Sequence, residues 1–206
     1  SLSEQQFIDC SAKYGNQGCQ GGGTPQTFQY AKDQRDGLCN EASYPYTAKN
    51  GQECRTKGCR VGIPPLGVKG FVAVAEGDEK GLMDAVTKGP VTVAIESDTA
   101  TFQLYAGGVL NDKDGRVCFE KHRIDHGVLI VGYGTDRGQD YWTIKNSWGN
   151  RWGERGYIRM ARGLSGPRGD GECGIKSMPV YPVVDGSRVK PPDVTASLVA
   201  LSVCLA

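Results

Sequence analysis

Apolar residues recur in short runs from the end of the first third of the chain onward. The runs begin near residue 68, are rich in β-branched and aromatic residues, and are bounded by Gly, Asp or Asn: VKGFVAVAE, VTVAIES, HGVLIVGYG, DYWTIKNSW and GYIRMAR. This composition and these boundaries predict strands. Several short strands joined by glycine-rich turns indicate an antiparallel, barrel-like sheet.

Helical spacing is concentrated in the first part of the chain and recurs once before residue 90. SLSEQQFIDC predicts a helix that begins at Ser3, because a glutamine follows three residues later. In TPQTFQYAKDQRDG we expect Thr24 as the N-cap, Pro25 at the first helical position and Gly37 as the stop. A further short helix is expected in DEKGLMDAVTKG, ending at Gly89.

These patterns divide the chain into two lobes and predict the α+β fold class. Residues 1–67 form a helical lobe that bears disulfides, and residues 68–184 form a β-barrel lobe. Residues 185–206 form a proline-containing C-terminal extension, whose apolar end is too short to span a bilayer as a helix, which takes about 20 residues. We favour a packed terminal segment over a lipid-anchor signal, which the small residues and the apolar tail also fit loosely.

The composition is typical of a globular protein. Hydrophobic residues make up 38% of the chain, charged residues 23%, and the net charge is +1. No basic tract is present that could neutralise a phosphate backbone, which argues against a nucleic-acid partner.

The cysteine content changes this picture. Eight cysteines in a chain of 206 residues indicate an oxidising compartment. A zinc site would favour close Cys-x-x-Cys pairs, but the closest pair, Cys54 and Cys59, has four residues between its members. The spacing therefore favours disulfides, and we expect neither a metal nor a cofactor.

The segment IDHGVLIVGYG places His126, one of two histidines, at the start of an apolar strand. A histidine there can be a core residue, a metal ligand or a catalytic base. A strand, the turn TDRGQD and a return strand separate it from Asn146, and such a hairpin brings the two side by side. An asparagine oxygen can accept the imidazole N–H and leave the other ring nitrogen for a thiol, while Trp148 covers the bond.

A set of short blocks follows one order along the chain up to about Val184: SEQQFIDC, GNQGCQGG, YPYTA, GPVTVAIE, FQLYAGGV, DHGVLIVGYG, KNSWGNRWGERGYIRM and CGI. In this set and order the chain resembles the papain-like cysteine peptidases, and among them the cathepsin L-like subgroup. The resemblance implies a papain-like two-lobed fold and a cysteine endopeptidase acting on peptides or proteins. It also implies a lysosomal, vacuolar or extracellular location.

The resemblance assigns roles to particular residues. It makes His126 the catalytic imidazole, Asn146 its orienting partner, Trp148 a shield for the pair and Asp125 a modulating acid. Gly21 and Gly22 match an exposed edge that binds the substrate backbone as an added strand.

The pocket for the second substrate residue before the cut follows from the same resemblance. Its expected lining carries no charge, which predicts an apolar or aromatic preference, and consists of Gly23, Thr24, Ala94, Ile124 and Met178. Gly23 and Thr24 are smaller than the residues often found at those positions, which leaves the width of the pocket open.

The nucleophile of the family is missing from these residues. Its signature, C-G-[SA]-C-[WY], occurs nowhere in the chain. Cys19 in NQGCQGGG is the nearest imitation, but three glycines follow it and would begin a helix poorly. We expect the nucleophile, and the glutamine of the oxyanion hole, in a segment that precedes Ser1. Residues 1–206 alone are then expected to hydrolyse no peptide by this mechanism.

The resemblance also implies disulfide pairs. Cys10 should pair with Cys54 and Cys118 with Cys173, and an additional Cys39–Cys59 bridge is plausible because both lie in one loop region. Two cysteines remain. Cys19 matches a half-cystine whose partner would lie in the same preceding segment, and Cys204 has no assigned partner.

Two other functions stay open on the sequence alone. The first is a catalytically inactive papain-fold protein kept as a binding or structural component of an assembly. The second is an unrelated, disulfide-rich secreted binding domain, which would make the shared blocks coincidental. Retention of His126, Asn146 and Trp148 favours the peptidase, because an inactive descendant has no physical need for them.

Overall fold

The computed structural model describes residues 1–111, 118, 123–166 and 168–186. The chain divides into two compact units. Unit 1 comprises Ser1–Val72 with the described residues from Pro182 onward, and unit 2 comprises Ala73–Tyr181. The division expected after residue 67 therefore falls later, and residues 182–184 belong to unit 1. The reason is that two neighbouring strands, Val68–Ala73 and Val180–Val184, each cross the boundary.

Most of the expected C-terminal extension, residues 187–206 with Cys204, lies outside the described residues. Its described beginning belongs to unit 1. There the Asp185 N–H donates to the carbonyl of Gly67 at 2.9 Å, and its carboxylate lies 3.0 Å from the Lys69 ammonium.

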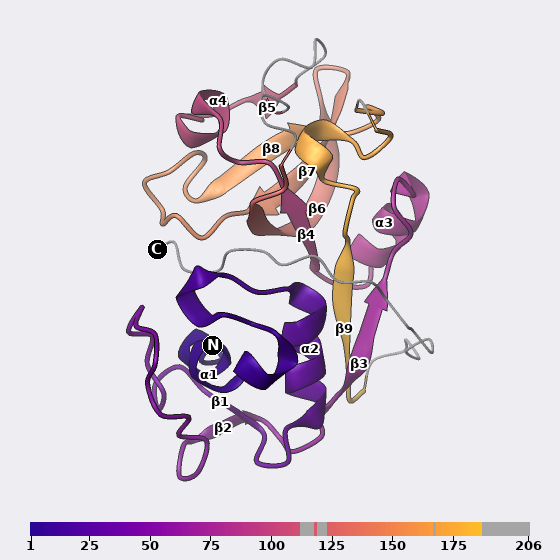
Figure 1. The fold of residues 1–206 in the computed structure, drawn as a ribbon. Helices are drawn as coiled ribbons and strands as arrows, with labels where there is room; N and C mark the ends of the chain where they lie inside the picture. The colour runs from indigo at the N-terminus through magenta and orange to yellow at the C-terminus, as the bar shows by residue number, and fades with distance from the viewer. Residues whose placement is uncertain (112–117, 119–122, 167, 187–206) are drawn as a thin grey trace. The chain divides into compact units, whose positions relative to one another are not determined.

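Unit 1 is built from short helices and a two-stranded antiparallel sheet (Figure 1). Its elements are α1 (Glu4–Cys10), η1 (Ala12–Tyr14), η2 (Gly18–Gln20), α2 (Thr24–Asp33), β1 (Leu38–Cys39) and β2 (Val61–Ile63). The first helix begins where the sequence predicts, because the Ser3 hydroxyl accepts the Gln6 N–H at 3.0 Å. The Gln6 side chain binds Tyr30 and the Cys39 N–H instead of completing a capping box, and so ties α1 to α2 and β1.

Helix α2 begins one residue earlier than expected. Its N-cap is Gly23, with Thr24 and Pro25 as the first two helical residues. The expected N-cap at Thr24 was wrong because the Gly23 carbonyl already accepts the first helical bond, from the Thr27 N–H at 3.0 Å, so Thr24 lies inside the helix.

The same helix ends at Asp33, before the expected stop at Gly37. Gln34 is extended, and its Nε2 donates to the carbonyl of Tyr30 at 2.9 Å, which satisfies one carbonyl of the last turn. Gly37 has a different role. At φ 82° it turns the chain into β1, and a Cβ there would lie 2.6 Å from the Ile63 carbonyl oxygen.

Buried side chains and two disulfides hold unit 1 together. The buried apolar residues are Tyr30, Ala31, Leu38 and Val68. The disulfides join Cys10 to Cys54 and Cys39 to Cys59, the two pairs expected for this part of the chain. A small core of this kind gains stability when cross-links restrict its unfolded state.

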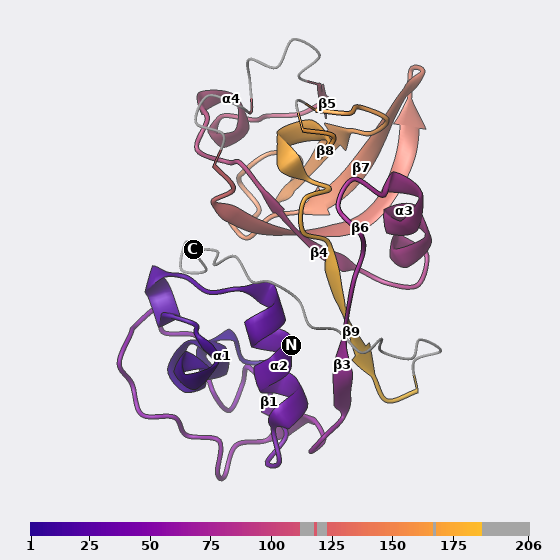
Figure 2. The ribbon, with the colours of Figure 1, turned by 45° about the vertical axis from the view of Figure 1, so that its right-hand side comes forward.

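Unit 2 holds most of a seven-stranded sheet in the order β3-β9-β4-β6-β7-β8-β5. The strands are β3 (Val68–Ala73), β4 (Val91–Ile95), β5 (Val109–Leu110), β6 (His126–Asp136), β7 (Gln139–Lys145), β8 (Tyr157–Ala161) and β9 (Val180–Val184). Each run predicted as a strand overlaps one of them, and the α+β class is confirmed. Figure 2 shows β4, β6, β7 and β8 curling together with α3 (Glu79–Val86) beside them.

The sheet is not wholly antiparallel. Strands β4, β6, β7 and β8 pair antiparallel, but β5 pairs with β8 in parallel. A hairpin forces an antiparallel pair, whereas β5 and β8 are separated by the whole β6–β7 hairpin and are free of that constraint. The expectation of an antiparallel lobe was therefore wrong at this edge.

The helices of unit 2 are short and capped by side chains. The Asp78 carboxylate accepts the Gly81 N–H at 2.9 Å and begins α3. That helix ends with Thr87 as its C-cap, before the expected Gly89, because the Thr87 hydroxyl donates to the carbonyl of Asp84. Two further elements are α4 (Ala100–Gln103) and η3 (Glu172–Gly174).

Buried residues alternate with less buried ones along the strands, and the buried residues form the core of unit 2. In β6 the even-numbered residues from 126 to 130 are buried, and the two residues between them, Gly127 and Leu129, are half-buried. The fully buried side chains include Ile95, Phe102, Ile130, Trp142, Ile144, Ile158 and Met160. His126 opens β6 on the buried face, so a polar imidazole lies next to an apolar core.

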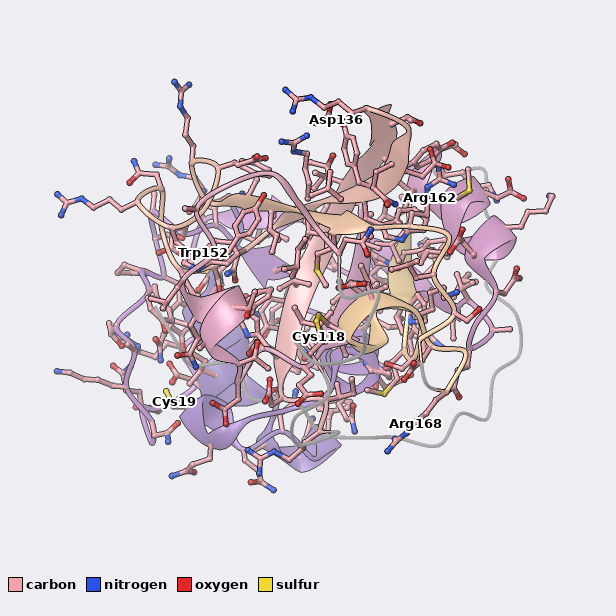
Figure 3. All side chains as sticks on the ribbon, turned by 90° about the horizontal axis from the view of Figure 1, so that it is seen from above. Cys19, Cys118, Asp136, Trp152, Arg162 and Arg168 are labelled. Carbon is pink, nitrogen blue, oxygen red and sulfur yellow. A yellow bond between two sulfur atoms is a disulfide. The ribbon has the colours of Figure 1, made fainter. Side chains whose placement is uncertain are left out.

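Cysteines in both units are oxidised. Cys118 and Cys173 form the third expected disulfide. Cys19, labelled in Figure 3, is also disulfide-bonded. The expectation that it has no partner within this chain was wrong, because disulfide pairing cannot be deduced from the spacing of cysteines along the sequence. No cysteine among the described residues is free.

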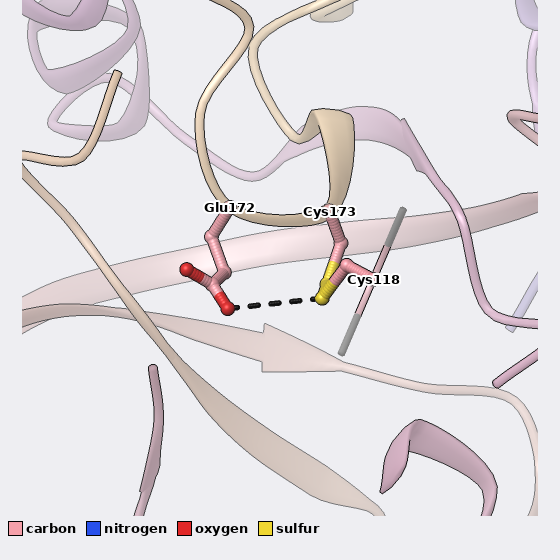
Figure 4. A group of neighbouring side chains, drawn as sticks. All are labelled: Cys118, Glu172 and Cys173. Carbon is pink, nitrogen blue, oxygen red and sulfur yellow. Dashed lines mark hydrogen bonds between the residues drawn. A yellow bond between two sulfur atoms is a disulfide. The ribbon is translucent and has the colours of Figure 1, made fainter. Parts of the chain in front are cut away.

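One cluster has the composition of a metal site but not its chemistry. Potential ligand atoms of Cys118, Glu172 and Cys173 lie within 4.8 Å of one another (Figure 4). The two sulfur atoms are joined in a disulfide, and a metal ligand has to be a thiolate. In the described parts of the chain, no helix is long and apolar enough to cross a membrane.

Candidate active site

His126 and Asn146 lie at the open end of the β6–β7 hairpin. The strands are joined by Arg137 and Gly138, both with positive φ, which is the two-residue turn that suits a twisted hairpin. Leu129 pairs with Lys145, so Asn146 lies one residue beyond the paired part of β7. The two residues are thus neighbours through this hairpin, but the asparagine projects from the following loop, not from the strand.

A short contact joins the two side chains. His126 Nε2 lies 2.8 Å from Asn146 Oδ1. The same oxygen accepts the backbone N–H of Ser147 at 2.7 Å. Because a backbone N–H can only donate, the atom that faces it has to be the amide oxygen, and His126 Nε2 has to carry a hydrogen. In its neutral form, His126 therefore keeps a lone pair on Nδ1.

Aromatic rings surround this contact. The Trp148 ring centroid lies 5.1 Å from that of His126, at an interplanar angle of 33°. Phe102 packs edge-on against Trp148 at 5.3 Å and lies 5.1 Å from Trp152, which is labelled in Figure 3. The imidazole is 5% exposed. Apolar rings of this kind exclude water that would compete for the hydrogen bond.

The loop that carries Asn146 and Trp148 is anchored at several points. The Asn146 N–H donates to the carbonyl of Gly156 at 2.9 Å, and Trp152 Nε1 donates to the carbonyl of Gln103 at 3.0 Å. The Glu154 carboxylate accepts hydrogen bonds from Nε and Nη2 of the Arg159 guanidinium on β8. These bonds to β8 and α4 hold the loop against the same unit that positions His126.

Burial and polar neighbours act in opposite directions on the imidazole. Burial lowers the pKa of His126 below its ordinary value of 6.5, because the charged form loses hydration. The bond to Asn146 and the negative charge of Asp125 raise the same pKa by smaller amounts. The neutral form of the His126 imidazole is therefore favoured over the charged form.

Asp125 has a hydrogen-bond partner that the sequence did not reveal. Its Oδ1 accepts both the backbone N–H and the hydroxyl of Ser97, each at 2.9 Å. Ser97 follows β4, whose last residue, Ile95, pairs with His126. The carboxylate next to the imidazole is thus fixed in position by the neighbouring strand.

The glycine edge belongs to unit 1 and is not exposed. Gly21, Gly22 and Gly23 are all buried, which contradicts the exposed edge implied by the resemblance. The Gly21 N–H and carbonyl are used within the loop by Gly18 and Gln17. Packing leaves no space for side chains there, since a Cβ on Gly22 would lie 2.4 Å from Asn16 Oδ1.

The residues expected to line the substrate pocket are divided between the units. Gly23 and Thr24 are at the start of α2 in unit 1, and the other three belong to unit 2. Within unit 2, Ala94 is buried on β4 and pairs with Gly127, the residue after His126. Ile124 packs against Gly174, and Met178 is half-buried. The pocket remains a prediction.

The described cysteines offer no nucleophile. All seven are disulfide-bonded: Cys10, Cys19, Cys39, Cys54, Cys59, Cys118 and Cys173. A sulfur in a disulfide has no proton to lose and cannot act as a thiolate.

Three residues at these sites were missed by reading the sequence. Ser97 directly follows the block GPVTVAIE and Phe102 begins FQLYAGGV, but nothing in those blocks indicates contacts with Asp125 or Trp148. Gln26 looked like an ordinary helix residue. Its amide proves to be buried beside Gly23.

Comparison with known proteins gives a consistent result. The family model described as papain family cysteine protease matches residues 1–183. Cathepsin L of Sarcophaga peregrina is 47% identical over 186 residues, which cover 89% of this chain and 51% of that protein. Cathepsin L1 of Drosophila melanogaster is 45% identical, with coverage of 89% and 46%. The chain spans about half the length of these curated relatives.

Solved structures agree with the sequence matches. The bromelain protease from Ananas comosus, in complex with the E64 inhibitor, superposes with a TM-score of 0.77 at 39% identity, over 89% of this chain and 78% of that chain. Procathepsin L 3 from the larval midgut of Tenebrio molitor gives a TM-score of 0.73 at 43% identity, over 89% and 56%.

Proposed function

Because the chain belongs to the papain family of cysteine proteases, we propose that it supplies the base and the orienting group of a cysteine endopeptidase. His126 is the base and Asn146 the orienting group. The thiolate comes from a cysteine of the protein outside residues 1–206. The observation that carries this proposal is the 2.8 Å contact from His126 Nε2 to Asn146 Oδ1, because it leaves Nδ1 for the thiol.

The proposed reaction follows from that arrangement. Nδ1 of His126 takes the thiol proton, and the thiolate attacks the peptide carbonyl carbon. The imidazolium then gives its proton to the leaving amine, which leaves an acyl-enzyme with a thioester. Water loses a proton to Nδ1 as it attacks this thioester, and the carboxylic acid product departs with the thiol restored.

The surrounding residues have supporting roles in this proposal. Asn146 keeps the imidazole of His126 oriented through both proton transfers. Trp148 excludes water from the hydrogen bond between His126 and Asn146. Asp125 adds negative charge beside the ring when it becomes an imidazolium. Peptides or proteins are the substrates, with an apolar or aromatic residue second before the cut. The oxidised cysteines support a lysosomal, vacuolar or extracellular site of action.

A thiol-directed epoxide probe tests the proposal on the native protein that contains this chain. We expect covalent labelling of one cysteine and loss of peptidase activity in proportion. A His126→Gln variant should lose most of the labelling, because no base then generates the thiolate, while a Lys145→Gln variant on the neighbouring strand should label normally. A folded protein that neither labels nor cleaves peptides would instead support an inactive papain-fold binding component.

A further inference from the structure

An Asn-Gly pair lies on the surface of unit 1, outside its helices and strands. Asn50 and Gly51 are both exposed, and the residue before them is anchored, because the Lys49 carbonyl accepts a hydrogen bond from Gln5 Nε2 at 2.9 Å. The Gly51 N–H donates no hydrogen bond to any described residue. Apart from its chain neighbours, no atom lies within 4 Å of the point where a Cβ of Gly51 would stand. The Gly51 nitrogen is therefore accessible to a reaction partner.

The side-chain amide of Asn50 is held by its oxygen. Oδ1 accepts the backbone N–H of Cys19 at 2.6 Å. Cys19 lies in η2, whose own N-cap, Gln17, makes no side-chain hydrogen bond to the helix. Gly18 makes room for this contact, since a Cβ there would lie 2.2 Å from Asn50 Oδ1. Asn50 thus supplies, from a distant loop, the acceptor that η2 lacks locally, while its Nδ2 bonds no described residue.

These contacts favour attack on the Asn50 amide by the next nitrogen in the chain. Oδ1 gains negative charge when a nucleophile adds to Cγ, and the Cys19 N–H that is aimed at this oxygen stabilises the charge. Glycine at position 51 has no side chain to obstruct the approach of its own nitrogen. Nucleophile, polarised carbonyl and leaving amide are therefore all present in one exposed turn.

Two asparagines of unit 2 lack this combination. Asn146 is 7% exposed, and the N–H of the following residue, Ser147, is already engaged by Asn146 Oδ1. Asn150 is exposed, but the next residue is Arg151, whose long side chain stands beside the nitrogen that would have to attack. Of these three asparagines, only Asn50 has a free and unobstructed nitrogen after it.

We propose that Asn50 is a site of spontaneous covalent modification, at which the Gly51 nitrogen attacks Cγ and converts the asparagine to aspartate or isoaspartate. The N–Cγ bond forms as the Gly51 N–H proton passes to hydroxide from the solvent. The Cγ–Nδ2 bond breaks as Nδ2 takes a proton from water and departs as ammonia, which leaves a cyclic imide. Water then opens the ring. Cleavage between Cγ and the nitrogen gives aspartate, and cleavage between the main-chain carbonyl carbon and the nitrogen gives isoaspartate.

The two products differ in their effect on η2. Aspartate keeps an oxygen on Cγ, so the Cys19 N–H retains its acceptor. Isoaspartate routes the main chain through Cγ, which lengthens the backbone by one carbon and removes that acceptor. The isoaspartate form should therefore release the Cys19 N–H. The modification needs only unit 1 and water, so it does not depend on the proposed thiolate chemistry.

The test uses the native full-length protein, first treated with the thiol-directed epoxide to prevent self-digestion. It is incubated at mildly alkaline pH and mapped by mass spectrometry. We expect Asn50 to convert before Asn150, and about three- to tenfold faster than in a synthetic peptide of residues 46–53, which lacks the Cys19 N–H. Conversion no faster in the folded protein than in the peptide would overturn the inference, as would earlier conversion of Asn150.

A matched pair of variants assigns the reaction to this position. In Asn50→Gln the longer side chain would have to close a larger ring, so we expect conversion at position 50 to disappear. Asn150→Gln is the control and should leave conversion of Asn50 unchanged. An undiminished rate of amide loss at position 50 in Asn50→Gln would contradict the proposed ring closure.

Hydrogen exchange of the separated products tests the effect on η2. We expect the Cys19 N–H to exchange about three- to tenfold faster in the isoaspartate form than in the unmodified protein, the value of one neutral hydrogen bond. The aspartate form should exchange like the unmodified protein. Equal exchange in all three forms would overturn the role of Asn50 as the acceptor for η2.

Discussion

The two units hold their candidate functional residues by different means. In unit 2, His126 is fixed between the neighbouring strand β4 and a cluster of aromatic rings, and Asn146 Oδ1 has both of its hydrogen bonds. In unit 1, the glycine edge depends on the side chain of Asn16 and leaves Gln26 Oε1 without a donor. The difference is therefore in the support of the oxygen atoms: two donors hold Asn146 Oδ1, and Gln26 Oε1 has none. The Asn146 Nδ2 atom also has no partner among the described residues.

The largest expected effect comes from the aromatic cluster of unit 2. Phe102 is fully buried and touches the rings of both Trp148 and His126. We expect Phe102→Ala to lower the free energy of unfolding by about 3–5 kcal/mol, through lost burial and a cavity. Denaturant titration followed by tryptophan fluorescence measures this change. Leu104→Ala is the control, since Leu104 is 80% exposed and should change stability very little.

Loss of the Asn16 network should be the next largest effect, and it should be confined to unit 1. Asn16→Ala removes the acceptor of the Gly23 N–H and the donor to two hydroxyls. We expect a loss of about 1–3 kcal/mol in the free energy of unfolding, because buried polar groups are left unsatisfied. Hydrogen exchange should accelerate at the start of α2. Equal acceleration in β6 and β7 would contradict a local role.

The stability of unit 2 should also depend on pH through His126. Its folded-state pKa is lowered below the ordinary 6.5 by burial, so the unfolded state binds more protons. The free energy of unfolding of residues 1–206 should therefore be unaffected by this group above pH 6.5 and fall as the pH drops below it. His126→Gln should remove this component. Denaturant titrations of both proteins across the range measure the difference.

Removal of the Ser97 hydroxyl should have the smallest effect. Ser97→Ala keeps the backbone N–H to Asp125 but loses one of two bonds to the carboxylate. We expect a loss of about 1 kcal/mol of stability, and an altered pKa of His126 in an NMR titration of its ring nitrogens. Ser97→Thr should restore the wild-type titration. A stability change without any effect on the imidazole would reduce Ser97 to a structural role.

Several features of the fold could be predicted from local sequence alone. The Ser3 cap of α1 and the strand segments follow from residue type and spacing over a few positions. The end of α2 at Asp33 was missed because the Gln34 side chain satisfies the Tyr30 carbonyl, and the N-cap at Gly23 was missed because it has no capping side chain that residue type could reveal. The parallel pairing of β5 was missed because no turn constrains it.

The sequence by itself determined the family and the hairpin that brings His126 and Asn146 together, because these depend on residue types in a recognisable order. The tertiary structure decided which atoms of these and other side chains form hydrogen bonds. Ser147 sets which ring nitrogen of His126 carries the hydrogen, and Asn16 leaves Gln26 without a donor. Both outcomes depend on which single atom reaches a given donor or acceptor, and a hydrogen bond is specified by position and direction, which the sequence does not contain.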